Sequence, residues 1–238
     1  MPLIVIEGVD GSGKRTQTNL LLDRLKKEGR PAHTLSFPQY GKKSAGPIEE
    51  LLNGRYGAPD AVDPHVASLF YAVDRFDASE SINKILASDS VLVLDRYATS
   101  NAAHQGGKIT DENARKEYIE WISHIEYDIF KIPKPDLVII LHVPAHISAT
   151  LTLQKPSRGY IEGAAQQDEV EKDLGHQKRA ESCYLWLAAQ HPDTYVVIEC
   201  FENGALLSPV TIHERVWNSV RESFTDHLKN FPIIRDRV

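Results

Sequence analysis

The stretch Glu7-Gly8-Val9-Asp10-Gly11-Ser12-Gly13-Lys14-Arg15-Thr16 follows the apolar run Leu3-Ile4-Val5-Ile6 and precedes a leucine-rich amphipathic segment. Its closely spaced glycines let the backbone wrap around an anion with several N–H groups turned inward. The helix that follows adds the positive end of its dipole. A strand, a glycine-rich loop and a helix in this order predict a loop that binds the phosphates of a nucleotide.

The residues of this loop predicted to contact the nucleotide are Gly8, Gly11, Ser12, Gly13, Lys14, Arg15 and Thr16. Lys14 stands where the β- and γ-phosphates would lie. A hydroxyl residue usually follows this lysine and binds Mg²⁺, but here Arg15 follows it and Thr16 comes one place later. The alternative is a structural turn with a capping threonine, which the strand–loop–helix context disfavours.

Short apolar runs alternate with longer amphipathic ones, which is typical of a parallel sheet covered by helices. Strands are expected at residues 3–7, 32–37, 91–94, 137–143 and 195–198. Helices are expected at 14–28, 45–52, 64–86, 111–125, 145–153, 168–189 and 212–228. Residues 155–167 lack periodicity and are expected to form a mobile loop, and 229–238 a weakly held tail. No repeat or linker divides the chain, so we expect one α/β domain over 1–238, with a five-stranded parallel sheet flanked by helices.

Composition excludes several classes of protein. The chain carries 27 Lys and Arg against 33 Asp and Glu, a net charge of −6, which argues against nucleic-acid binding. There is no apolar run of about 18 residues and no basic leader, so we expect neither a membrane span nor a signal peptide. Cys183 and Cys200 match no zinc spacing, and we expect buried thiols in a cytoplasmic protein.

Asp95 ends the expected strand 91–94 and is followed by Arg96 and Tyr97. A carboxylate at the end of a strand beside a phosphate-binding loop is placed to hold Mg²⁺ or its water. The alternative is an aspartate that caps a helix. Because the phosphate-binding loop is present, we favour the metal.

Three further segments narrow the function: Phe37-Pro38-Gln39-Tyr40-Gly41, Leu69 to Arg75, and Asp95 to Ala103. With the loop, and in this order, they make the chain from Leu3 to about Ala189 resemble the thymidylate kinase family, most closely its actinobacterial branch. The resemblance implies a P-loop nucleoside monophosphate kinase, which transfers the γ-phosphoryl group of ATP to dTMP, gives dTDP and ADP for dTTP biosynthesis, requires Mg²⁺ and forms a homodimer. The alternatives are a kinase for another nucleotide or for deoxynucleosides, and a nucleotide-binding protein without catalysis.

The resemblance implies a substrate site made of Asp10, Phe37, Tyr40, Tyr71, Arg75, Arg96, Asn101 and His104. Tyr71 matches the aromatic residue that stacks on thymine, and Phe37 would close the same pocket. The alternative for both rings is packing in the core. Tyr71 and Arg75 lie one helical turn apart, so they share a face, and Arg75 matches the arginine near thymine O4.

The remaining contacts follow from the same resemblance. Arg96 matches the arginine that holds the dTMP phosphate, which suits a guanidinium because its fork meets phosphate oxygens in pairs. Tyr40 would add a hydrogen bond near that phosphate. Asn101 matches a contact to the base edge, where an amide offers a donor and an acceptor together. His104 stands near the sugar 2′ carbon, where the actinobacterial branch often has tyrosine.

The implied catalytic residues are Asp10, Lys14, Arg96 and Arg158, and the metal ligands would be Asp10, Asp95 and Glu171. Asp10 would orient the 3′-hydroxyl of dTMP, and the alternative is that it caps the first helix. Arg158 would supply from the lid 155–167 the cation that phosphoryl transfer needs. Glu171 could reach Mg²⁺ at the acceptor phosphate, or it only favours a helix N-terminus. Adenine contacts are expected near 199–206.

Overall fold

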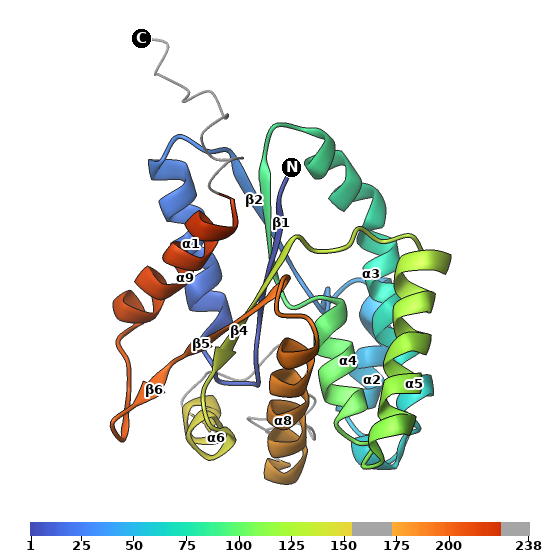
Figure 1. The fold of residues 1–238 in the computed structure, drawn as a ribbon. Coiled ribbons are helices and arrows are strands. Elements are labelled where there is room, and N and C mark those ends of the chain that lie inside the picture. The colour runs from blue at the N-terminus through green and yellow to red at the C-terminus, as the bar shows by residue number, and fades with distance from the viewer. Residues whose placement is uncertain (154–172, 225–238) are drawn as a thin grey trace.

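The computed structural model describes residues 1–153 and 173–224, and a five-stranded sheet lies at its centre (Figure 1). The strands are β1 (Leu3–Glu7), β2 (Ala32–Ser36), β3 (Val91–Asp95), β4 (Leu137–His142) and β5 (Tyr195–Glu199). They pair in the order β2-β3-β1-β4-β5, and every pairing is parallel. The predicted α/β class with five parallel strands is confirmed, with strand bounds within about one residue.

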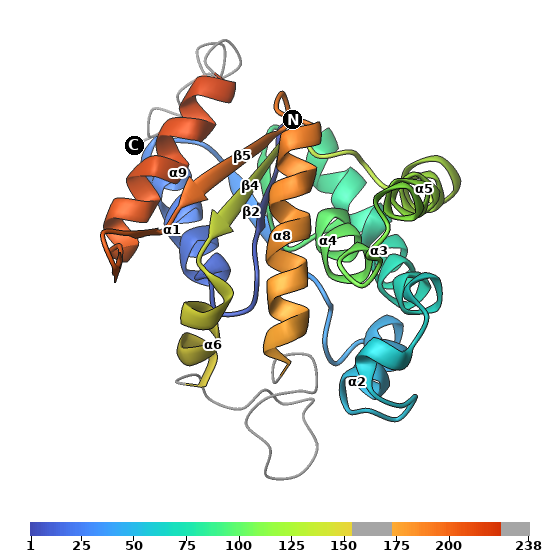
Figure 2. The same cartoon turned by 60° about the horizontal axis from the view of Figure 1, so that its bottom comes forward.

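Helices cover both faces of this sheet. They are α1 (Lys14–Lys27), α2 (Gly46–Leu52), α3 (Pro64–Ala87), α4 (Ala98–Gly106), α5 (Glu112–Ser123), α6 (Ala145–Leu153), α8 (Leu174–Gln190) and α9 (Pro209–Ser223). Shorter turns lie at η1 (Lys43–Ala45), η2 (Pro59–Ala61) and the π-helical η3 (His124–Ile129). Figures 1 and 2 show α1 and α9 on one side of the sheet and α3, α4, α5 and α8 on the other.

The strands read as continuous apolar runs because each has both faces buried. Alternate side chains of the central strand β1 go to opposite cores: Leu3 and Val5 pack toward α3, α4 and α8, while Ile4 and Ile6 pack toward α1 and α9. This period of two is the geometry of an extended chain, and two-sided burial removes any need for polar residues in the strand. Both cores hold the sheet rigid beneath the loops at its carboxyl edge.

Three local elements differ from the sequence prediction. Helix α4 was not predicted, because all but one of its residues are buried and it therefore lacks a polar stripe. The pair of strands β6 (Phe201–Glu202) and β7 (Ala205–Leu206) forms a hairpin around Asn203 and Gly204, within the segment predicted to contact adenine. The expected helix 111–125 ends at Ser123 and continues as η3, which turns Glu126 inward.

Several predictions fall on residues that the structure does not describe. These are the lid 155–167, the tail 229–238, and the parts 168–172 and 225–228 of two expected helices. In the described part of α8, Asp173 caps the helix by accepting from the His176 N–H. Cys183 and Cys200 are buried and unbridged, as predicted. None of the described helices has the length and apolarity that a bilayer crossing requires.

Candidate active site

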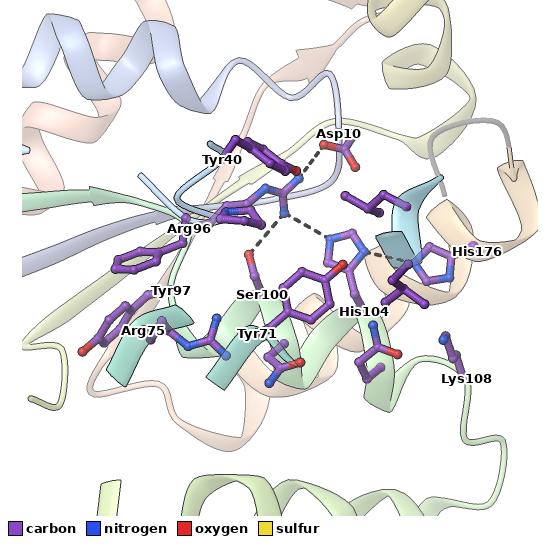
Figure 3. Close-up of a pocket in the computed structure, with 16 residues that line it drawn as sticks. Asp10, Tyr40, Tyr71, Arg75, Arg96, Tyr97, Ser100, His104, Lys108 and His176 are labelled. Atoms are coloured by element: carbon purple, nitrogen blue, oxygen red, sulfur yellow. Dashed lines mark hydrogen bonds and ion pairs between the residues drawn. The ribbon is translucent and has the colours of Figure 1, made fainter. Parts of the chain in front are cut away.

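The candidate site lies where β1 and β3 end, beside the glycine-rich loop. Ligands of open α/β sheets bind in this crevice, beyond the carboxyl ends of the strands. A pocket there encloses about 710 Å³ of space between atoms, part of it open to solvent. It is lined by Asp10, Phe37, Pro38, Tyr40, Leu51, Leu52, Tyr71, Arg75, Arg96, Tyr97, Ser100, Asn101, His104, Gln105, Lys108 and His176 (Figure 3).

The glycines of the loop are required by its conformation. Gly8 has φ +136° and Gly11 has φ +89°, values that side chains strain against. A Cβ at Gly8 would lie 2.6 Å from the Leu141 carbonyl oxygen, and a Cβ at Gly11 would overlap the Ser148 carbonyl. The loop is therefore wound tightly against β4 and α6, as a phosphate cradle requires.

The polar side chains of the loop form a buried group, Lys14 and Ser12, and an exposed group, Arg15 and Thr16. Lys14 is buried, and its Nζ donates to the carbonyl oxygens of Gly8 at 3.0 Å and Val9 at 2.8 Å. The Ser12 hydroxyl is buried and makes no hydrogen bond within the described residues, so it can serve a ligand. Arg15 and Thr16 are exposed on the first turn of α1.

A buried carboxylate joins the loop to α4. The Glu7 carboxylate accepts the Tyr97 N–H at 2.9 Å, the Ser100 N–H at 3.0 Å and the Tyr184 hydroxyl at 2.9 Å. Burial raises the pKa of Glu7, and it is opposed by the hydrogen bond that the Ser100 hydroxyl donates at 2.6 Å, by the charge of Arg96 and by the hydrogen bonds from Tyr97 and Tyr184. Glu7 thus caps α4 and fixes the start of that helix relative to the glycine-rich loop.

Arg96 is held at the mouth of the pocket in a left-handed backbone conformation, with φ +69°. Its Nη2 donates to Asp10 Oδ1 at 2.5 Å, and its Nη1 donates to the Ser100 hydroxyl at 3.2 Å. Gln177 of α8 holds Asp10 from the other side, since its Oε1 accepts the Asp10 N–H at 3.3 Å. Burial lowers the pKa of Arg96, but the surrounding acidic groups, Asp10 first among them and then Tyr184, Glu7 and Asp95, together raise it well above its usual value and keep the guanidinium protonated.

A second arginine lies deeper. Arg75 of α3 forms a buried bidentate pair with Glu126 of η3, through Nε at 2.6 Å and Nη2 at 2.5 Å. Asn101 of α4 donates its Nδ2 to the Ser68 carbonyl at 3.1 Å and to Glu126 at 3.3 Å. The buried Asn101 Oδ1 has no hydrogen-bond partner within the described residues. An acceptor that is unpaired and lines a pocket is placed to bind a ligand N–H.

Aromatic rings form the walls of the pocket. Phe37 is buried against Tyr97, with ring centroids 5.8 Å apart, so the core-packing alternative also holds for this ring. Tyr71 is half-buried and faces into the pocket between Ser100 and His104, and Tyr40 lies above Arg96 (Figure 3). The ring of Tyr71 offers an apolar face to a planar ligand.

The structure brings all eight predicted substrate residues to one pocket, and Arg158 and Glu171 lie outside the described residues. Asp95 is half-buried at the end of β3 and does not line this pocket. Sequence reasoning missed the residues that support the site: Glu7, Ser100, Glu126, His176 and Gln177. Only Glu7 had a usable signal, as a charged residue that ends an apolar strand directly before the loop.

The chain is similar to known proteins of one family. A family model described as "Thymidylate kinase" matches residues 6–203. The chain is 36% identical over 189 residues to the thymidylate kinase of Mycobacterium tuberculosis, covering 79% of this chain and 86% of the relative. It is 34% identical to that of Caulobacter vibrioides, covering 82% and 86%. A solved thymidylate kinase from Candida albicans has the same fold, with a TM-score of 0.68 over 95% of this chain and 93% of that one, at 21% identity.

Proposed function

This chain belongs to the thymidylate kinase family and phosphorylates dTMP to dTDP, and we propose that the pocket beside the glycine-rich loop holds the dTMP. Members of the family use ATP, and the loop Gly8–Lys14 is the proposed site of its phosphates. The observation that carries the proposal is the unpaired acceptor Asn101 Oδ1 in the wall of this pocket.

Base recognition follows from how Asn101 and Arg75 are held. Both partners of Asn101 Nδ2, a carbonyl and a carboxylate, only accept hydrogen bonds, so the amide orientation is fixed and Oδ1 is left for a donor. Thymine offers that donor at N3–H. Nε and Nη2 of Arg75 donate hydrogen bonds to Glu126, so Nη1 is left to donate to the thymine O4 acceptor.

The transfer itself requires positioning and charge more than acid–base chemistry. An oxygen of the dTMP phosphate attacks the γ-phosphorus of ATP, and the bond to the β–γ bridging oxygen breaks to release ADP. Arg96 holds the acceptor phosphate and Lys14 the β- and γ-phosphates, so both reduce repulsion between the two anions. Asp10, kept in place by Gln177, accepts a hydrogen bond from the 3′-hydroxyl of dTMP.

Mg²⁺ completes the charge balance in this proposal. No group of three or more His, Cys, Asp or Glu side chains within the described part of the chain could hold a metal alone. The carboxylates of Asp10 and Asp95 are oxygen donors and so suit Mg²⁺, which proteins bind through one or two carboxylates together with phosphates and water. Asp10 and Asp95 are the described candidates, and bound Mg²⁺ would neutralise charge on the transferring phosphoryl group.

The experiment is ADP release with ATP, Mg²⁺ and each of dTMP, dUMP, UMP, CMP, dGMP and N3-methyl-dTMP. Turnover is expected to be strongest with dTMP, and N3-methylation is expected to lower kcat/KM by about 10²-fold or more, because it removes the donor to Asn101. Retained turnover with N3-methyl-dTMP would place the base elsewhere. Strong turnover with UMP, by contrast, would show only that His104 does not exclude ribose.

A homodimer through α3 is also proposed. Val66, Leu69, Val73 and Phe76 of α3 are each 39–50% exposed and follow one another at spacings of three, four and three residues. That spacing makes one apolar stripe along the helix, of the kind that packs against a partner helix. Sedimentation of the native chain and of Val73→Asp tests this: the native chain is expected to sediment as a dimer and the variant as a monomer.

A further inference from the structure

A line of hydrogen-bonded side chains runs from the pocket to the protein surface. Arg96 Nη1 lies 3.2 Å from His104 Nε2, His104 Nδ1 lies 3.1 Å from His176 Nε2, and His176 Nδ1 lies 3.0 Å from Asp60 Oδ1 (Figure 3 shows the first two contacts). The four residues belong to four elements: the turn after β3, α4, α8 and η2.

Close packing of two helices makes this line possible. At the C-terminal end of α4, a Cβ at Gly107 would lie 2.9 Å from the Arg179 carbonyl of α8. Only glycine therefore lets the helices approach this closely. The approach stacks the rings of His104 and His176, with centroids 5.3 Å apart and planes inclined by 23°.

The two ends fix the direction of every hydrogen bond in the line. A guanidinium only donates, so His104 Nε2 accepts from Arg96 and its proton is on Nδ1. That N–H donates to His176 Nε2, which puts the second proton on His176 Nδ1, facing Asp60. A carboxylate only accepts, so the line is consistent from end to end. Both imidazoles are then neutral and carry their proton on Nδ1.

The charges around the two rings agree with this neutral state. Burial lowers the pKa of His104, and Arg96, His176 and Lys14 lower it further, against Asp10, which raises it. The ring of Tyr184 also faces His104, edge-on at 5.8 Å.

At the outer end, burial lowers the pKa of His176, with Lys108 and Arg179 acting in the same direction and Asp60 opposing them. Asp60 also pairs with Arg179, and Asp173 caps α8 beside it. A proton added to Nε2 of either ring would set two N–H groups against each other.

We propose that Asp60 and His176 are positioning residues for phosphoryl transfer. They hold His104 as a hydrogen-bond acceptor and so fix the guanidinium of Arg96 for the acceptor phosphate. Without them, only Arg96 opposes the Nε2–H tautomer that water favours, and in that tautomer the His104 N–H faces the N–H of Arg96. This inference rests on the proposed placement of the dTMP phosphate at Arg96.

Steady-state kinetics of three variants tests the proposal. Asp60→Ala is expected to lower kcat/KM for dTMP about tenfold, the scale typical of lost supporting partners, with KM for ATP unchanged. Asp60→Asn is expected to restore most of the activity, because its amide oxygen still accepts from His176. Arg179→Ala is the matched control: it removes the exposed ion pair of Asp60 but leaves the line intact, and activity is expected within twofold of the native chain.

Imidazole ¹⁵N chemical shifts of the native chain give a second readout that is independent of catalysis. In the native chain, protons are expected on Nδ1 of both His104 and His176. In Asp60→Ala, the Nε2–H tautomer of His176 is expected to be more populated. A proton on His104 Nε2 overturns the proposal, as does unchanged kcat/KM in Asp60→Ala. If Arg96→Ala leaves KM for dTMP unchanged while the tautomers are as expected, the placement of the phosphate is wrong instead.

Discussion

Removing the carboxylate of Glu126 should destabilise this protein more than any surface charge deletion. Arg75 is 2% exposed and Glu126 is 1% exposed, and the two share two hydrogen bonds of 2.6 and 2.5 Å. Glu126→Ala leaves the guanidinium buried without a counter-charge, which costs about 3–5 kcal/mol of unfolding free energy. Domains are stable by only about 5–15 kcal/mol, so the loss is a large fraction of the total.

Urea denaturation followed by circular dichroism measures this loss. The matched control is Glu80→Ala, which removes the exposed Glu80–Lys84 ion pair on α3, the helix that carries Arg75, and is expected to leave the midpoint unchanged. If Glu126→Ala does not fold, the test is whether the double variant Arg75→Leu/Glu126→Leu folds. Apolar replacement of a buried pair is often neutral, so the double variant should be more stable than Glu126→Ala alone.

Two results would contradict this reasoning. A loss below about 1 kcal/mol in Glu126→Ala, the range of an exposed pair, would mean that water or another acid reaches Arg75. A double variant less stable than Glu126→Ala would mean that the site cannot be packed with apolar side chains.

Three further outcomes are expected. Gly11→Ala should lower affinity for ATP and the thermal midpoint, because its Cβ would overlap the Ser148 carbonyl at a φ of +89°; ATP titration and thermal melting measure both. Arg158→Ala should lower kcat about 10²-fold, and a raised KM with unchanged kcat would exclude its catalytic role. His142 lies between Glu181 at 2.9 Å and Glu199 at 2.7 Å, and although burial lowers its pKa, these partners raise it above its usual value. Its stabilisation should be present below pH 6.5 and be lost as pH rises through the raised pKa, so urea midpoints of the native chain and His142→Gln should converge at alkaline pH.

Local patterns were sufficient to predict the sheet and the phosphate loop. The strands are apolar throughout because both of their faces are buried, and the loop needs glycine at each positive φ. The eight predicted substrate residues were named from the resemblance to the thymidylate kinase family and not from local pattern. Their assignment to dTMP came from resemblance alone.

The supporting residues could not be predicted, because their roles depend on contacts between distant segments. Glu126 is 51 positions from Arg75, and it points inward only because η3 replaces the last turn of an ordinary helix. His176 and Asp60 are 116 positions apart and meet only because the fold brings the start of α8 beside η2. In sequence, each of these reads as an ordinary polar residue of a solvated segment.

Glu126 links the two groups that we assign to the base. It accepts from Arg75 through both oxygens and from Asn101 Nδ2, so one carboxylate orients the donor for thymine O4 and the acceptor for N3–H. Such preorganisation spares the ligand the cost of ordering these side chains. It also means that the two contacts are not independent. In a double-mutant cycle of Arg75→Leu and Asn101→Leu, the losses in dTMP affinity should therefore not add, since either change alters the carboxylate that holds the other.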